Sequence, residues 1–111
     1  MIAEFSVVPV GGVENITAYV GEVVETVHQS GLPYMLTPSS TIVEGSWEEL
    51  VDVLGRARTA ALAGSGYYVM YVKFGEEAGA GSKIEWNVDS VRDHLGHPVM
   101  RRERSDPPGP G

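Results

Sequence analysis

The chain has 111 residues, no cysteine and a formal net charge of −7 at pH 7. This length suits one modest hydrophobic core, so we expect a single domain. The negative charge has the wrong sign for binding nucleic acid or an anionic membrane surface, and the lack of cysteine excludes disulfides, thiol nucleophiles and cysteine-based zinc sites. Because no stretch approaches the ~20 apolar residues of a membrane span and the N-terminus does not resemble a signal peptide, we expect a cytoplasmic location.

The first half of the chain predicts a strand, a helix and a hairpin. Residues 2–10 are rich in β-branched and aromatic side chains, which is typical of a strand. Apolar residues then recur at helical spacing, with Asn15 as the expected N-cap and Gly31 at the expected left-handed C-terminal position, so we expect a helix over about residues 16–30. Two short apolar runs on either side of Pro38-Ser39-Ser40 predict a hairpin.

A second helix is predicted to begin directly after this hairpin. Ser46 followed by Glu49 matches a capping box, in which each side chain accepts from the other residue's free backbone N–H. The Gly-Ser-Gly sequence at 64–66 is expected to end the helix. The buried stripe predicted from helical spacing consists of Trp47, Leu50, Val51, Leu54, Ala57 and Ala61.

The last part of the chain predicts a strand, a short helix and a tail. Residues 67–74 have the strongest strand pattern in the chain. A second capping box, Ser82 with Glu85, predicts a third helix that ends at Gly96. Residues 97–111 contain three prolines near their end and almost no apolar side chains, so we expect a disordered tail.

The predicted order of elements indicates an α+β fold. Two right-handed strand-helix-strand units that share one four-stranded antiparallel sheet form a ferredoxin-like βαββαβ sandwich, with the helices on one face of the sheet. We therefore predict a single ferredoxin-like domain over residues 1–96, with an additional C-terminal helix.

The other face of this sheet is predicted to be open and partly apolar. Strand alternation turns one set of side chains in residues 67–74 toward the helices and leaves Tyr67, Val69, Tyr71 and Lys73 on the open face. A contiguous exposed patch that contains several large apolar side chains usually marks an interaction surface. We therefore expect the chain to form a homo-oligomer through its sheet.

The same alternation gathers polar side chains on the open face, namely Glu4, Ser6, Glu44, Tyr71 and Lys73. A carboxylate that an oligomer partner covers must be paired or hydrogen-bonded, so a polar ligand would bind here. The alternative is that Lys73 pairs with Glu4 or Glu44 as ordinary cross-strand support. From the residues alone, this ion pair is favoured over ligand binding.

No stretch of the chain has the pattern of a catalytic or cofactor motif. His94 and His97 beside Asp93 have a spacing that metal ligands can use, but histidines at a helix end are more often solvated or near free carbonyls. The glycine-rich stretches lack the lysine of a phosphate-binding loop, and no nucleophile elbow is present. We predict no catalytic residues, no metal and no cofactor.

Three stretches resemble a small family once filed as a domain of unknown function and now called thiamine-binding-protein-like: MIAEFSVVPVG, residues 19–50 and KIEWNVDSVRDHL. The specific features lie in the middle stretch, where Tyr34 follows Ser-Gly-Leu and Thr41-x-x-Glu44-Gly45 precedes the second helix. The resemblance implies a ferredoxin-like fold, dimers that pair into tetramers through their sheets, and a pocket near the subunit contacts for thiamine or its hydroxymethylpyrimidine moiety. Family members commonly carry Met-Gly where this chain has Ser39-Ser40.

Together with the open-face prediction, the resemblance favours a non-enzymatic protein that binds thiamine or a related aminopyrimidine. We expect Glu44 to accept from the amino group or a ring proton, Tyr34 and Tyr71 to offer aromatic surface to a thiazolium, and Thr41 and Ser6 to act as hydroxyl partners. One alternative is a structural or regulatory homo-oligomer without a ligand. Another is a small cofactor-free enzyme, which would need a buried polar cluster in the core.

Overall fold

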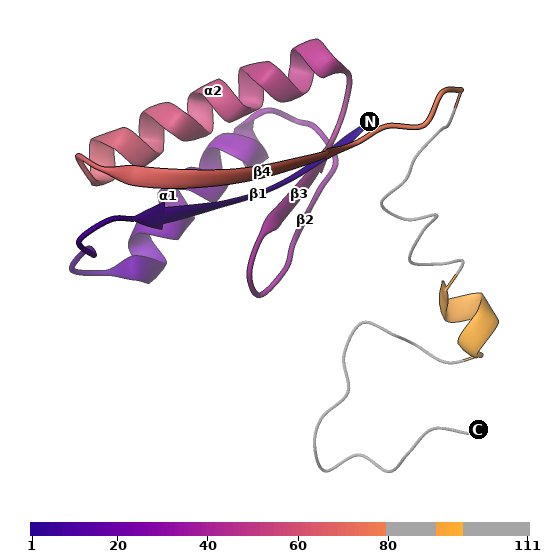
Figure 1. Cartoon of the computed structure of the whole chain (residues 1–111), viewed down its shortest axis with the longest axis horizontal. Coiled ribbons are helices and arrows are strands. Elements are labelled where there is room, and N and C mark those ends of the chain that lie inside the picture. The colour runs from indigo at the N-terminus through magenta and orange to yellow at the C-terminus, as the bar shows by residue number, and fades with distance from the viewer. Residues whose placement is uncertain (80–90, 97–111) are drawn as a thin grey trace.

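The computed structural model describes residues 1–79 and 91–96 (Figure 1). The predicted order is confirmed, and residues 91–95 are also helical. The Ser82–Glu85 capping box and the tail predicted over residues 97–111 lie outside the described residues. The six elements are β1 (Ile2–Pro9), α1 (Ile16–Gln29), β2 (Tyr34–Leu36), β3 (Thr41–Glu44), α2 (Trp47–Gly64) and β4 (Tyr68–Gly75).

The four strands form one antiparallel sheet in the order β2-β3-β1-β4 (Figure 1). The two longest strands, β1 and β4, pair along their whole length, and the short β2–β3 hairpin lies on the other side of β1. This strand order, with both helices contributing to one core on one face of the sheet, is the ferredoxin-like arrangement.

The hydrophobic core lies between the sheet and the two helices. Every second residue of β1 and β3 points into it, which confirms the alternation predicted for these strands. The hydroxyl of Tyr19 donates to the carbonyl of Ala61 at 3.1 Å, so this buried phenol has a partner. The buried apolar residues are Ala3, Phe5, Tyr19, Val23, Val27, Val43, Leu50, Val53, Ala57 and Ala61.

The buried stripe predicted for α2 is wrong at two of its six residues. Trp47 and Val51 are exposed, at 53% and 46%, whereas Val53 is buried. The apolar stripe of this helix is wider than the surface it packs against, so helical spacing alone does not show which flank is covered. Trp47 instead lies beside Phe74 of β4, with ring centroids 5.2 Å apart.

The helix starts follow the predicted local signals. The Asn15 side chain accepts from the N–H of Ala18 at 3.0 Å. Ser46 and Glu49 form the reciprocal capping box, with hydrogen bonds of 3.1 and 2.9 Å. The pKa of Glu49 is lowered because its carboxylate accepts from the Ser46 backbone N–H. Gly31, after α1, has the expected positive φ of 75°.

Candidate functional site

The strand register brings the predicted open-face side chains together. Glu4 of β1 lies directly between Lys73 of β4 and Ile42 of β3, and Ser6 lies opposite Tyr71. Directly opposed residues of antiparallel strands share one face of the sheet. The prediction that these side chains share the face away from the helices is therefore confirmed.

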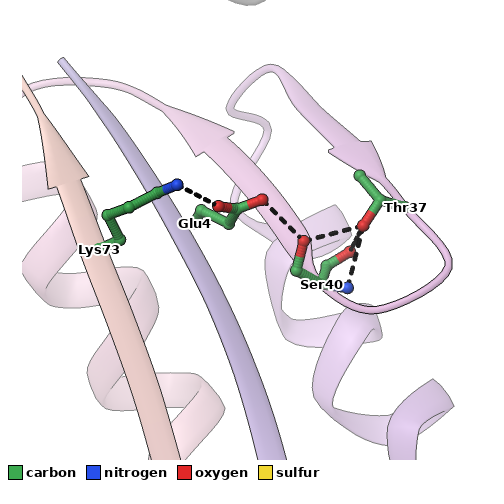
Figure 2. A network of polar contacts seen from close by, with 4 residues as sticks. All are labelled: Glu4, Thr37, Ser40 and Lys73. Atoms are coloured by element: carbon green, nitrogen blue, oxygen red, sulfur yellow. Dashed lines mark hydrogen bonds and ion pairs between the residues drawn. The ribbon is translucent and has the colours of Figure 1, made fainter.

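A chain of polar contacts crosses this face from β4 to the turn of the β2–β3 hairpin (Figure 2). Lys73 Nζ forms an ion pair with Glu4 Oε1 at 2.9 Å, and Ser40 Oγ donates to Glu4 Oε2 at 2.9 Å. Ser40 Oγ lies 2.8 Å from Thr37 Oγ1, which also accepts from the Ser40 backbone N–H at 3.0 Å. Glu4 thereby links the hairpin turn to the centre of the sheet.

The ionised form of Glu4 is favoured by these partners. Its pKa is lowered, first because the carboxylate accepts from Lys73 and second because it accepts from Ser40. The Lys73 side chain is 79% exposed and that of Glu4 31%, so water screens much of their attraction. The ion pair predicted as the alternative to ligand binding is thus present.

Two hollows adjoin the hairpin turn and share the lining residues Phe5, Ser6, Ser39 and Ser40. The open-face hollow, of about 360 Å³, lies over the sheet; its other lining residues are Glu4, Tyr71, Val72 and Lys73. The inner hollow, of about 140 Å³, lies between the turn and α1; its other lining residues are Val7, Val20, Val23, Val24, Leu36, Thr37, Pro38 and Thr41. A polar compartment therefore meets an apolar one at the turn.

Three of the five predicted ligand-binding residues gather around this turn. Ser6 lines both hollows, Thr41 lines the inner one and Tyr71 lines the open-face one. Thr41 is almost completely buried, because it occupies a core-facing position of β3. The hydroxyls of Ser6 and Thr41 thus belong to the same region of the fold.

Tyr34 and Glu44 lie elsewhere. Tyr34 is opposite Val43, which puts it on the helix-facing side of the sheet. Its hydroxyl is 3.0 Å from His28 Nδ1, beside a separate hollow along α1. Glu44 is on the open face but pairs with Ile2, at the end of β3 away from the turn. The carboxylate that lines the open-face hollow is therefore Glu4.

Sequence reasoning missed Ser40 and Thr37 as parts of this site. The hydroxyl-rich Thr-Pro-Ser-Ser turn was the available signal, because such side chains often hydrogen-bond to nearby backbone groups. The contact between Ser40 and Glu4 joins residues 36 positions apart, which no local pattern indicates.

Neither a metal cluster nor a membrane-spanning helix is found in residues 1–79 and 91–96. No three histidine, aspartate or glutamate side chains in these ranges are grouped to hold an ion. None of the helices there is both long and apolar enough to cross a bilayer.

Comparison with known proteins agrees with this fold. The chain is 29% identical to a UPF0045 protein of Mycobacterium bovis over 99 residues, 88% of this chain and 97% of that protein. The structure of a DUF77 domain from Bacillus cereus is 31% identical, with a TM-score of 0.73, covering 84% of this chain and 90% of that one. A Thermotoga maritima protein with a suggested role in thiamine biosynthesis or salvage is 27% identical, with a TM-score of 0.72 over 82% of this chain and 97% of that one.

The family model described as thiamine-binding protein matches residues 3–92. Apart from Ile2 at the start of β1, this range includes the four strands, both long helices and the hairpin turn with its two hollows. The chain belongs to the thiamine-binding protein family.

Proposed function

We propose that this protein binds thiamine, or an aminopyrimidine related to it, at the hairpin turn and does not catalyse a reaction on it. Membership of the thiamine-binding protein family supports the ligand class. The observation that carries the proposal is the pair of hollows that meet at Ser6 and Ser40, one mostly apolar and the other lined by the carboxylate of Glu4.

The chemistry of the two hollows suits the two halves of thiamine. The open-face hollow holds Glu4, whose negative charge attracts a thiazolium, and Tyr71, whose ring can add cation–π attraction. The net charge of −7 also favours a cationic ligand over an anionic one. The inner hollow, walled by valines of α1, suits the less polar pyrimidine ring.

The state of Glu4 supports binding rather than catalysis. A general acid or base works best when its pKa lies near the working pH, which for a carboxylate requires a raised pKa. Lys73 and Ser40 instead lower the pKa of Glu4. Among the described residues that line the two hollows, there is no histidine and no second carboxylate with which Glu4 would share a proton.

A second copy of the chain is proposed to cover the open face and thereby roof the open-face hollow. Tyr71 borders this hollow and is 64% exposed, and Tyr67, four residues earlier in the chain, is 65% exposed. Water-exposed aromatic area of this kind is stabilised by burial against a complementary surface. Assembly as a dimer or as a dimer of dimers through the sheets would provide that surface.

Titration calorimetry with thiamine and with hydroxymethylpyrimidine tests the proposal. We expect the wild-type chain to bind at a stoichiometry of up to one ligand per chain. Glu4→Gln should weaken thiamine binding by about 10- to 100-fold, because it removes a charged partner of the ligand and of the turn. The matched variant Glu44→Gln, on the same face of the sheet but away from the turn, should bind like wild type.

The two substitutions separate the possible failures. A folded wild-type protein that gives no heat with either compound would contradict the proposed function. Loss of binding in Glu44→Gln but not in Glu4→Gln would contradict the hairpin-turn site and support the position expected from the sequence.

A further inference from the structure

Strand β1 has a neighbour on both sides only along its first half. Its pairing with β4 runs from Ile2 to Pro9, whereas its pairing with β3 runs from Ile2 to Phe5. Beyond Phe5 the hairpin chain departs into the turn at residues 37–40. Beyond Phe5, the edge of β1 that pairs with β3 therefore has no β3 residue opposite it and faces the hairpin turn.

The hydrogen bonds at the two ends of β1 show which residue faces this open edge. Met1 and Gly45 exchange two backbone hydrogen bonds, each of 3.0 Å. In an antiparallel pair this exchange recurs at every second residue, so the odd-numbered residues of β1 direct their backbone groups toward β3. Val10 donates to Tyr67 at 2.9 Å, as expected if the even-numbered residues face β4. The N–H and C=O of Val7 therefore point toward the turn, two residues beyond the last pair with β3.

Val7 also lines the inner hollow, whose size admits one ring. The hollow measures about 140 Å³. Valines of α1, Phe5 and Leu36 form its apolar walls, and residues 37–41 of the hairpin with Ser6 complete it. An apolar cavity of about 150 Å³ is known to bind benzene, so the inner hollow has room for a single six-membered ring. A ring in this position would lie beside a backbone donor and a backbone acceptor of the same residue.

We propose that the main chain of Val7 recognises the hydrogen-bonding edge of the ligand ring, its C=O accepting from a ring amino group and its N–H donating to the adjacent ring nitrogen. The ligand class is thus a planar six-membered nitrogen heterocycle with an amino group next to an unsubstituted ring nitrogen. This inference deepens the proposed function and rests on it. The ring takes the hydrogen bonds that another strand would take, as in the addition of a peptide to a sheet edge.

The sizes of the hollows also orient the ligand. Because the inner hollow holds only the ring, any larger substituent must extend past Ser6 and Ser40 into the open-face hollow. There it meets Glu4 and Tyr71, which suit a cationic group. The inner hollow then recognises the ring, and the open-face hollow recognises the charge.

Two compounds that differ only at the ring amino group test the inference. Replacing this group of thiamine by a carbonyl oxygen makes the adjacent ring nitrogen a donor. The ring carbonyl would then face the C=O of Val7, and the ring N–H would face its N–H. We expect this analogue to bind about 100-fold more weakly, because both hydrogen bonds are lost and the polar groups remain without partners. Calorimetry on the full chain measures both affinities.

Amide hydrogen exchange followed by NMR provides a readout at the residue itself. The Val7 amide should exchange faster than those of Ser6 and Val8 in the free protein and become protected when thiamine is added. Ser6 and Val8 face β4 and serve as internal controls, whose protection should not change. Equal affinity for both compounds with no new protection at Val7 would overturn this inference while leaving the proposed function intact. Binding of neither compound would overturn the proposed function itself.

Discussion

Each carboxylate oxygen of Glu4 has a different partner, Lys73 on the edge strand β4 and Ser40 on the hairpin turn. The ionised carboxylate accepts from both at once, and its bond to Ser40 ties the hairpin turn to this one side chain. The same residue is the proposed partner of a cationic ligand. Structural support and ligand binding are therefore expected to respond to pH together.

The pH dependence of stability tests the structural role of Glu4. Because the pKa of Glu4 is lowered in the folded state, its contribution is present above its ordinary value of 4.5 and is lost as pH falls through the folded value. Glu4→Gln should thus lower the free energy of unfolding at pH 7, by less than about 1 kcal/mol for a partly exposed pair. Urea unfolding of both proteins from pH 7 to pH 3 measures the difference.

The difference between wild type and Glu4→Gln should shrink as the pH falls below 4.5, since protonated Glu4 resembles glutamine in charge. Contributions from the other carboxylates are common to both proteins and cancel. A difference that stays constant over the whole range would show that the charge of Glu4 does not support the turn.

Helix α2 carries two glycines with different surroundings. A Cβ added at Gly64 would lie 2.8 Å from Cδ2 of Tyr19, whose ring packs against the end of this helix. A Cβ added at Gly55 would meet nothing within 4 Å. The glycine at 64 therefore permits the close approach of α1 to α2, whereas the glycine at 55 only lowers helix propensity.

Alanine substitutions at these two positions should shift stability in opposite directions. We expect Gly55→Ala to raise the free energy of unfolding by up to about 1 kcal/mol, as in other exposed helix positions. Gly64→Ala should lower it by about 1–3 kcal/mol, because the buried Tyr19 ring must move. Thermal unfolding followed by circular dichroism compares them, and a stabilised Gly64→Ala variant would contradict the packing described here.

At the scale of the whole molecule, the sheet built from the described residues has a helix-covered face and an open face. The helix-covered face forms the core, while the open face carries exposed Tyr71 above a hollow that also contains Glu4. A second copy that packs on this face would both bury the aromatic surface and enclose the proposed ligand. Assembly and binding are then linked, since a ligand that binds only the covered site stabilises the oligomer.

Size-exclusion chromatography tests this assembly. We expect the wild-type chain to elute as a dimer or tetramer and Tyr71→Lys to shift toward the monomer, because a charge would be buried in the sheet interface. Leu62→Lys, at a residue of α2 that is 45% exposed, serves as the matched control and should elute like wild type. A monomeric wild type, or an unchanged Tyr71→Lys oligomer with native circular dichroism, would contradict assembly through the open face.

Much of the fold follows from local patterns in the sequence. The order of the elements, the capping box at Ser46 and the alternation of β1 were all predicted correctly, because each depends on residues a few positions apart. The flank of α2 on which Trp47 and Val51 lie was predicted wrongly, because its burial depends on how far the sheet and α1 extend beneath the helix.

By itself, the sequence determined which face of the sheet each strand residue occupies, since side chains alternate with a period of two. Only the tertiary structure decided where along the strands these residues meet. The register joined Glu4 with Lys73 and Ser40, separated Glu44 from the hairpin turn, and ended the β1–β3 ladder two residues before Val7. Register depends on the geometry of turns and on contacts between distant segments, so no spacing within one strand reveals it.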